Sequence, residues 1–199
     1  MDTKRLLKKG ISYKKPNSLI EMQPRDKDNK PIKYSFFQLY FIEYLSVLTV
    51  MSNKENKRLT IRVTDLMEGS GILIGKYSKA RREILSLHEK SICIPTLEPN
   101  PEYQPGNIKE KEFITRTKVY NMFSQADIVE NKGVITIGFS PEIIDLLRFN
   151  ESKGRYTKMH TWFMHRDRLN TGWSIRIYQL LRQYKGIGLR DIDLETLRA

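Results

Sequence analysis

The feature that most constrains the fold is a run of sixteen largely apolar residues, FFQLYFIEYLSVLTVM, at positions 36–51. Apolar side chains occupy most helical faces of this run, and Gln38 and Glu43 are among the few polar interruptions. Its length and composition favour a largely buried helix over a strand. Ser35 precedes the run and belongs to a residue type that commonly caps a helix. The pattern therefore predicts a central core helix that begins after Ser35.

The segment that follows shows an order of elements typical of a winged helix. In chain order we predict a strand at 59–63, a short helix at 64–67, an amphipathic helix at 75–90, a strand at 92–94, a proline-containing loop at 95–111, and strands at 113–123 and 134–139 joined by a polar connection. Ser140 and Pro141 then form a helix-start signal, which predicts a helix through Leu147. The expected fold class is α+β, a winged helix-turn-helix.

Both ends of the chain are basic. Residues 1–16 carry six lysines or arginines against one acid, and Pro16 interrupts any regular element, so we predict either a mobile arm that follows a phosphate backbone or a solvated tail. Residues 18–22 are expected to form a short strand. Near the other end, a helix is predicted to pack through an apolar stripe and to direct polar residues away from the core. The stripe comprises Trp173, Ile177, Leu180, Leu181 and Tyr184, and the polar residues are Arg176, Gln179 and Gln183.

The overall charge points to a polyanion as the partner. The chain has 35 Lys and Arg against 23 Asp and Glu, a formal net charge of +12. Such a balance is expected of a nucleic-acid binder, although a merely soluble basic protein would share it. Cys93 is the only cysteine, which excludes an intrachain disulfide and fits a reducing cytoplasm. No secretory h-region and no apolar stretch of membrane-spanning length occurs, so we expect no membrane association.

Patterns that would indicate catalysis are absent from the sequence. It contains no P-loop, nucleophile elbow, dinucleotide glycine fingerprint or HExxH motif. It also lacks the His-apolar-His triplet that a nucleophilic tyrosine would need for metal-assisted strand cleavage. The neighbourhoods of His88, His160 and His165 supply no obvious further metal ligands, and we assign these residues to packing or phosphate contact. We expect a protein without cofactor, metal or catalytic activity.

Three groups of basic and hydroxyl residues are candidate contacts to duplex DNA. On the helix at 75–90 they flank the apolar stripe, as a groove-facing helix requires, but a solvated helix face would look the same. On the predicted wing, charged residues alternate along a strand, and ordinary exposed charges are the alternative there. The last group lies in the strongly basic final third. The candidates are Lys76, Ser78, Lys79 and Arg82, then Arg116, Lys118 and Lys132, and finally Lys158, Arg166, Arg168 and Arg176.

Several blocks of the sequence resemble the iteron-binding replication initiators of theta-replicating plasmids. They are PNSLIEMQ, LTIRVTDLMEGSGILIGKYSKARREILSLHEKSICI, GVITIGFSPEIIDLLRFNESKGRYTKMH and LNTGWSIRIYQLLRQYKG, of which SIRIYQLLRQY is the most specific. The resemblance implies two winged-helix domains, the first of which dimerises and contacts the DNA backbone while the second reads the repeats. It places the first domain at 17–156 after a basic arm at 1–16, a connecting segment at 157–172, and the truncated start of the second domain at 173–199. Residues 76–90 would be the third helix of the first domain and residues 113–139 its wing.

The resemblance leaves two functional hypotheses. In the first, the protein binds repeated duplex sites at an origin and recruits host replication proteins such as a helicase or initiator, with a homodimer that represses transcription. In the second, it is a non-catalytic dimerisation and autorepression module that contacts DNA only weakly. Both place the protein in the cytoplasm.

Overall fold

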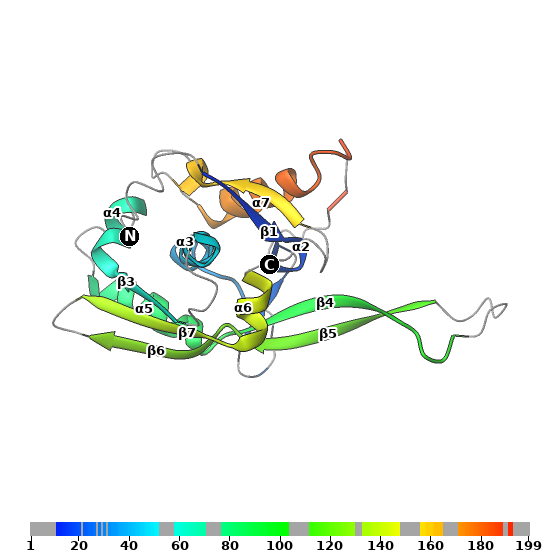
Figure 1. Ribbon diagram of the computed structural model, residues 1–199, viewed down its shortest axis with the longest axis horizontal. Coiled ribbons are helices and arrows are strands. Elements are labelled where there is room, and N and C mark those ends of the chain that lie inside the picture. The colour runs from blue at the N-terminus through cyan, green and yellow to red at the C-terminus, as the bar shows by residue number, and fades with distance from the viewer. Residues whose placement is uncertain are drawn as a thin grey trace.

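The computed structural model describes residues 11–20, 22–26, 28, 30, 32–51, 58–70, 77–103, 112–129, 133–147, 156–164, 171–188 and 191–192. Helix α3 (Phe36–Met51) runs through the centre, with further elements on both of its sides (Figure 1). The side-chain oxygen of Ser35 accepts a hydrogen bond of 3.2 Å from the amide of Gln38, which confirms the predicted cap. Twelve of the sixteen residues of α3 are buried, as the apolar run predicts.

A winged helix forms one side of the molecule. Its elements are α3, β3 (Arg58–Arg62), α4 (Val63–Ser70), α5 (Tyr77–His88), β6 (Phe123–Val129) and β7 (Val134–Phe139). The three strands form an antiparallel sheet in the order β3-β7-β6, so the first strand pairs with the last. Helix, strand, two helices and a returning hairpin are the winged-helix arrangement, and α5 is its third helix. The predicted fold class is thereby confirmed.

The wing differs from the sequence prediction. It is the β6–β7 hairpin, because residues 124–129, expected to be part of a polar connection, lie in a strand that begins at Phe123. The predicted wing strand at 113–123 is instead β5 (Phe113–Asn121), which pairs with β4 (Ser91–Pro99) in a separate sheet with β2 (Gln23–Arg25). This β4–β5 ribbon is inserted between α5 and the wing and projects from the body of the molecule (Figure 1).

Two prolines account for the difference between the predicted strand at 92–94 and the longer β4. Pro95 and Pro99 suggested a loop, yet they pair with Thr117 and Phe113 of β5. Strand β2 pairs only with residues 91–93 of β4, so both prolines lie beyond its end. A missing proline N–H therefore removes no ladder bond on that side of β4.

A second layer covers the other side of α3. Strand β1 (Ser12–Pro16) pairs antiparallel with β8 (Tyr156–His160), and α7 (Gly172–Gln183) packs against α3 and β8. The prediction of an unstructured arm is wrong for residues 12–16, because Tyr13 and Lys15 are buried there. The expected strand at 18–22 is also wrong, since α2 (Asn17–Ile20) occupies most of it.

Two short elements complete the described fold. Helix α6 (Pro141–Leu147) confirms the predicted helix start, although the Ser140 hydroxyl donates to the Asn121 carbonyl instead of capping the helix. A 3-10 turn, η3 (Thr161–Met164), follows β8.

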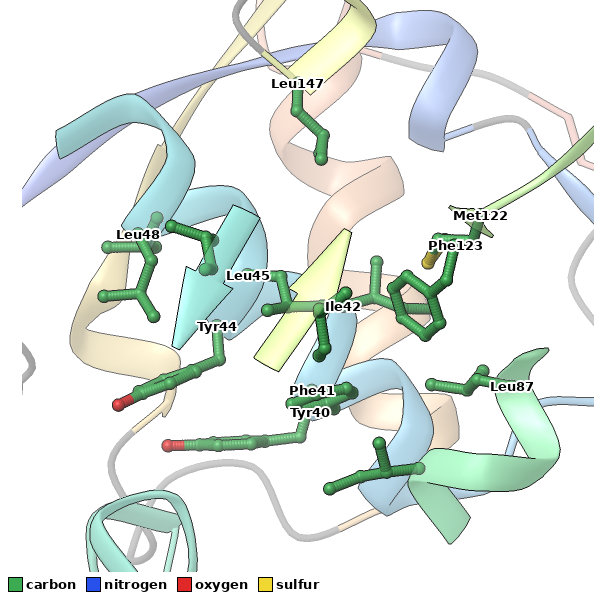
Figure 2. Packing of buried hydrophobic residues seen from close by; sticks show 14 of the residues in the cluster. Tyr40, Phe41, Ile42, Tyr44, Leu45, Leu48, Leu87, Met122, Phe123 and Leu147 are labelled. Atoms are coloured by element: carbon green, nitrogen blue, oxygen red, sulfur yellow. The ribbon is translucent and has the colours of Figure 1, made fainter. Parts of the chain in front are cut away.

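The apolar core lies between α3 and the winged-helix sheet (Figure 2). Phe41 of α3 meets Phe123 of β6 edge to face at 6.4 Å between ring centroids, and Phe123 meets Phe139 of β7 in the same way at 6.0 Å. Such pairs are favourable geometries for aromatic rings. Leu87 of α5 joins them, so apolar contacts pack α5 against α3 on this side.

Candidate nucleic-acid interface

Helix α5 separates a buried apolar face from an exposed polar one. Ala80, Ile84 and Leu87 are buried, as the spacing of the stripe predicted. Ser78, Lys79 and Arg82 are exposed. The outer face also holds a shallow hollow of about 330 Å³, which is lined by Ser78, Arg81, Arg82, Leu85, Ser86 and Glu89. The hollow thus brings two arginines and two hydroxyl groups together with Leu85 and the carboxylate of Glu89.

The first turn of α5 adjoins the wing. Gly133, immediately before β7, has φ +59°, a left-handed conformation that residues other than glycine rarely adopt. A Cβ atom there would lie 3.7 Å from the ring of Tyr77, the first residue of α5. The carbonyl of Gly133 accepts a 2.9 Å hydrogen bond from the amide of Val63. Helix α5, the wing and the start of α4 therefore meet at this glycine.

Polar contacts also tie α5 to α3. The Ser35 hydroxyl donates to the carboxylate of Glu83 at 2.8 Å, and the side-chain amide of Gln38 donates to the hydroxyl of Ser86 at 2.6 Å. Lys90, just after the helix, donates to the side-chain oxygen of Gln38 at 2.7 Å. These bonds orient the helix about its axis, so its exposed face is fixed relative to the wing.

The ribbon carries two of the predicted contact residues, Arg116 and Lys118. Both lie exposed on β5 and both approach Glu98 of β4, at 3.3 Å and 2.9 Å. The bond from Lys118 lowers the pKa of the Glu98 carboxyl, and the same bond raises the pKa of Lys118. The carboxylate of Glu98 thus offsets part of the positive charge of Arg116 and Lys118. Both residues lie on β5 and not on the β6–β7 wing.

The other predicted contact residues are distributed widely. Lys158 is exposed on β8, on the side of α3 opposite α5. Lys76, Lys132, Arg166 and Arg168 lie outside the described residues. Arg81 and Ser86, which line the hollow on α5, were not singled out from the sequence because they fall between the apolar stripe and the exposed flank.

Arg176 is not at the surface, because α7 packs with the opposite face from the one predicted. Arg176 and Gln179 are buried, with Arg176 only 5% exposed. Trp173, Ile177 and Leu181, three residues of the expected core stripe, are 46%, 41% and 68% exposed. Of that stripe, Leu180 is buried as expected. The periodicity was right, but the assignment of its faces was wrong.

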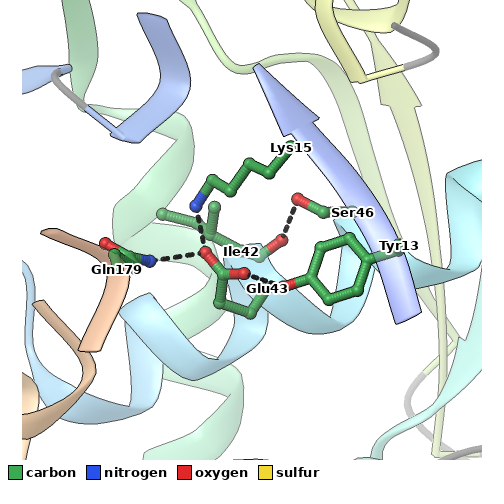
Figure 3. A network of polar contacts seen from close by, with 6 residues as sticks. All are labelled: Tyr13, Lys15, Ile42, Glu43, Ser46 and Gln179. Atoms are coloured by element: carbon green, nitrogen blue, oxygen red, sulfur yellow. Dashed lines mark hydrogen bonds and ion pairs between the residues drawn. The ribbon is translucent and has the colours of Figure 1, made fainter. Parts of the chain in front are cut away.

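Glu43 explains this inversion. Its carboxylate, fully buried in the middle of α3, accepts hydrogen bonds from the Tyr13 hydroxyl, the Lys15 ammonium and the side-chain amide of Gln179, the last at 2.7 Å (Figure 3). A buried charge must be paired and hydrogen-bonded to be tolerated. Burial lowers the pKa of Lys15, while Glu43 acts in the opposite direction. The polar face of α7 is therefore drawn inward to this carboxylate.

Within the ranges that the structure describes, no three His, Cys, Asp or Glu side chains gather as a metal site would require. Among the same residues, none of the helices has the length and apolarity needed to cross a bilayer.

Two solved structures of RctB share the fold of this chain at low sequence identity, and a third solved structure is similar to a smaller part of it. A crystal structure of RctB domains 2-3 has a TM-score of 0.51 at 10% identity, and the match covers 85% of this chain and 60% of that one. A structure of selenomethionine derivatives of RctB domains 2 and 3 has a TM-score of 0.51 at 9% identity, with coverages of 88% and 69%. The WH1 domain of MSBI1.176, a replication protein isolated from a multiple sclerosis patient, has a TM-score of 0.35 at 13% identity, with coverages of 56% and 74%.

A family model assigns the chain more directly. No curated protein sequence matches it. The model described as Initiator Replication protein, WH1, matches residues 12–182, which span the winged helix and the second layer that contains β1, β8 and α7. Because the match covers most of the chain and the fold agrees with it, the protein belongs to this family of replication initiators.

Proposed function

We propose that this protein initiates plasmid replication by binding repeated duplex sites at an origin and recruiting host replication proteins such as a helicase or initiator. It acts by binding and not by catalysis. The observation that supports this proposal is the exposed basic face of α5, which the wing and α3 hold in a fixed orientation. Ser78, Lys79 and Arg82 form the proposed contact.

The chemistry of this face suits duplex DNA. Arginine and lysine bind phosphates and the acceptor edge of guanine, while serine hydroxyls hydrogen-bond either to phosphates or to bases. The third helix of a winged helix can enter the major groove of duplex DNA, because that groove is wide enough to admit an α-helix. Residues on its first turns would then reach base edges while the wing lies beside the backbone.

The proposal is tested with the double variant Lys79→Ala/Arg82→Ala, titrated against origin-repeat and scrambled duplexes over a salt series. We expect weaker binding and a plot of log affinity against log salt whose slope is shallower by about 1.8, since each phosphate contact contributes about 0.9. Loss of the preference for the repeat would show that these residues also read bases.

Arg116→Ala/Lys118→Ala is the charge-matched control, since it also removes two positive charges but from the ribbon, where Glu98 is close to both. We expect this control to change the slope less than the α5 variant does. Equal effects of the two variants would mean that net charge alone drives binding, and an absence of binding by the unmodified protein at low salt would refute the proposal.

A second candidate function, a dimer that represses transcription with weak DNA contact, is favoured by one observation. Within the described sheets, β5 pairs only with β4 and is therefore an edge strand. It carries Phe113 and Val119, which are 49% and 56% exposed. An exposed edge can add a strand from a second copy of the chain. Sedimentation at several concentrations separates the candidates, because a tight dimer with negligible DNA affinity supports the second and contradicts the first.

A further inference from the structure

The β1–β8 ribbon presents a polar outer surface on the side of α3 away from α5. Tyr13 and Lys15 of β1 and Thr157 and Met159 of β8 point inward and are buried. The residues between them face outward because side chains alternate along a strand. Lys14 and Lys158 are direct partners across the two strands, and Ser12 is paired with His160. Two lysines thus stand side by side on this surface.

Helix α7 adds further cations beside them. The guanidinium of Arg182 donates two hydrogen bonds, of 3.1 and 2.7 Å, to the carbonyl of Lys158, which places its charge against the ribbon. Lys185 lies exposed in the turn that follows α7. The ammonium of Lys14 lies 4.6 Å from the ring centre of Tyr156, an aromatic residue on the same face. We call the surface formed by Lys14, Lys158, Arg182 and Lys185 the ribbon patch.

The three elements that build the ribbon patch contain no acidic residue. Their sequences are SYKKP in β1, YTKMH in β8 and GWSIRIYQLLRQ in α7. This composition contrasts with the β4–β5 ribbon, where Glu98 lies within 4 Å of both Arg116 and Lys118. The charged residues of these three described elements are therefore all positive, and a concentration of one sign of charge attracts a polyanion.

Partial burial and the positive charges of the ribbon patch both lower the pKa of the neighbouring His160. Its Nδ1 atom shares a 2.9 Å hydrogen bond with the hydroxyl of Ser12. Its pKa lies below the usual value, first because of partial burial and then because of Arg182, Lys158 and Lys185. The three charged groups that lower this pKa are cations, and they come from both β8 and the end of α7.

The ribbon patch cannot be an extension of the α5 surface. Helix α3 contacts α5 on one side and β1 and α7 on the other, and Figure 1 shows these elements on opposite sides of α3. A straight duplex lying along α5 would leave the patch uncovered.

We propose that the ribbon patch is a second binding surface for the phosphate backbone of duplex DNA. It makes contacts independent of sequence, because lysine acts on phosphates as a point charge and nothing here enters a groove. The proposal rests on the proposed function only in its choice of DNA as the polyanion. An acidic protein bound at the same place is the competing explanation.

The test is the triple variant Lys14→Ala/Lys158→Ala/Lys185→Ala in the full chain. Arg182 is kept because its bonds to the Lys158 carbonyl fasten α7. We expect the slope of log affinity against log salt to fall by up to about 2.7, at about 0.9 per phosphate contact, with the preference for repeat over scrambled duplex unchanged. Lys33→Ala/Arg58→Ala/Arg116→Ala removes three exposed charges elsewhere and is the matched control.

A second readout reports on the patch itself. Phosphates placed at the patch offset the surrounding cations, so duplex DNA is expected to raise the pKa of His160, as followed by NMR titration of the imidazole. The Lys79→Ala/Arg82→Ala variant should show the same rise in the His160 pKa, provided that the duplex concentration is high enough for this variant to bind.

An unchanged slope, a slope change no larger than that of the control, or an unchanged His160 pKa in saturating duplex would each overturn the inference. These results leave the proposed function intact as long as the α5 variant loses affinity. If neither the α5 variant nor the patch variant differs from the control, both proposals fail.

Discussion

The two sides of α3 differ in the kind of interaction at the centre of each contact. Towards α5 and the wing, the contact is a close-packed aromatic and aliphatic core in which Phe41, Phe123 and Phe139 meet edge to face. Towards β1 and α7, the centre of the contact is the buried carboxylate of Glu43 with its three donors. The first kind of contact tolerates small changes in shape, whereas the second requires every partner to be present. We therefore expect the contact between α3 and the second layer to tolerate fewer substitutions than the contact between α3 and the winged-helix sheet.

The largest expected effect comes from removing the carboxylate. Glu43→Ala leaves the Lys15 ammonium buried without its partner and should lower the free energy of unfolding by about 3–5 kcal/mol. The double variant Lys15→Met/Glu43→Leu removes both charges and should recover at least half of that loss, because a buried ion pair can be replaced by apolar residues at little cost. Urea denaturation of the three proteins measures this. A double variant as unstable as Glu43→Ala would show that the pair itself, and not an orphaned charge, stabilises the layer.

An intermediate effect is expected from alkaline pH. Burial, and then Glu43, raise the pKa of Tyr13, and burial also raises the pKa values of Tyr34 and Tyr40. An unfolded tyrosine loses its proton near pH 10, whereas these folded ones keep it, so stability falls as the pH rises above about 10. Each such tyrosine contributes about 1.4 kcal/mol per pH unit. Burial lowers the pKa of Lys15, so the folded protein releases this proton at a lower pH than the unfolded chain does. Just below the ordinary pKa of lysine, this difference makes stability rise with pH, which opposes the effect of the tyrosines.

Tyr13→Phe isolates the share of this effect that belongs to the second layer. Between about pH 9 and about pH 11 the variant should lose about 1.4 kcal/mol less than the unmodified protein does. Thermal or urea unfolding at both pH values provides the comparison. Equal losses in the two proteins would mean that the phenol of Tyr13 ionises in the folded state.

The smallest effect is expected on the apolar side. Ile84 of α5 is fully buried, and Ile84→Val should cost about 1 kcal/mol, as typical for the loss of one buried methylene. This cost should be the same at neutral pH and above pH 10, because no titratable group is involved. A cost that varies with pH would contradict the division into an apolar and an ionic side.

The sequence predicted three helices well because each carries a local signal, whereas it assigned the wing to the wrong strand. The apolar run of α3, the stripe of Ala80, Ile84 and Leu87 on α5 and the Ser140-Pro141 start of α6 each specify an element from neighbouring residues alone. The exposed positions Ser78, Lys79 and Arg82 follow from the same periodicity.

The second layer could not be predicted in this way. Residues 12–16 look like part of a basic tail until Glu43 and β8 are beside them. On α7, the hydrophobic pattern gave the helix but the wrong buried face, because the attraction of Gln179 to a carboxylate 136 residues earlier has no local signature. Lys158 was among the predicted contacts and Lys14 lies in the predicted basic arm, but no local signal places them beside Arg182, because these residues come together only through pairing of distant strands.

The pairing of β1 with β8 also determines when this layer can form. Ser12 and His160 are 148 residues apart, so a nascent chain exposes β1 long before its partner strand has been synthesised. Glu43 and Lys15, only 28 residues apart, can meet early, whereas Gln179 arrives last. Contacts this distant in sequence slow folding. Closure of the second layer should therefore be the final step of assembly during translation, completing a winged helix that has already folded.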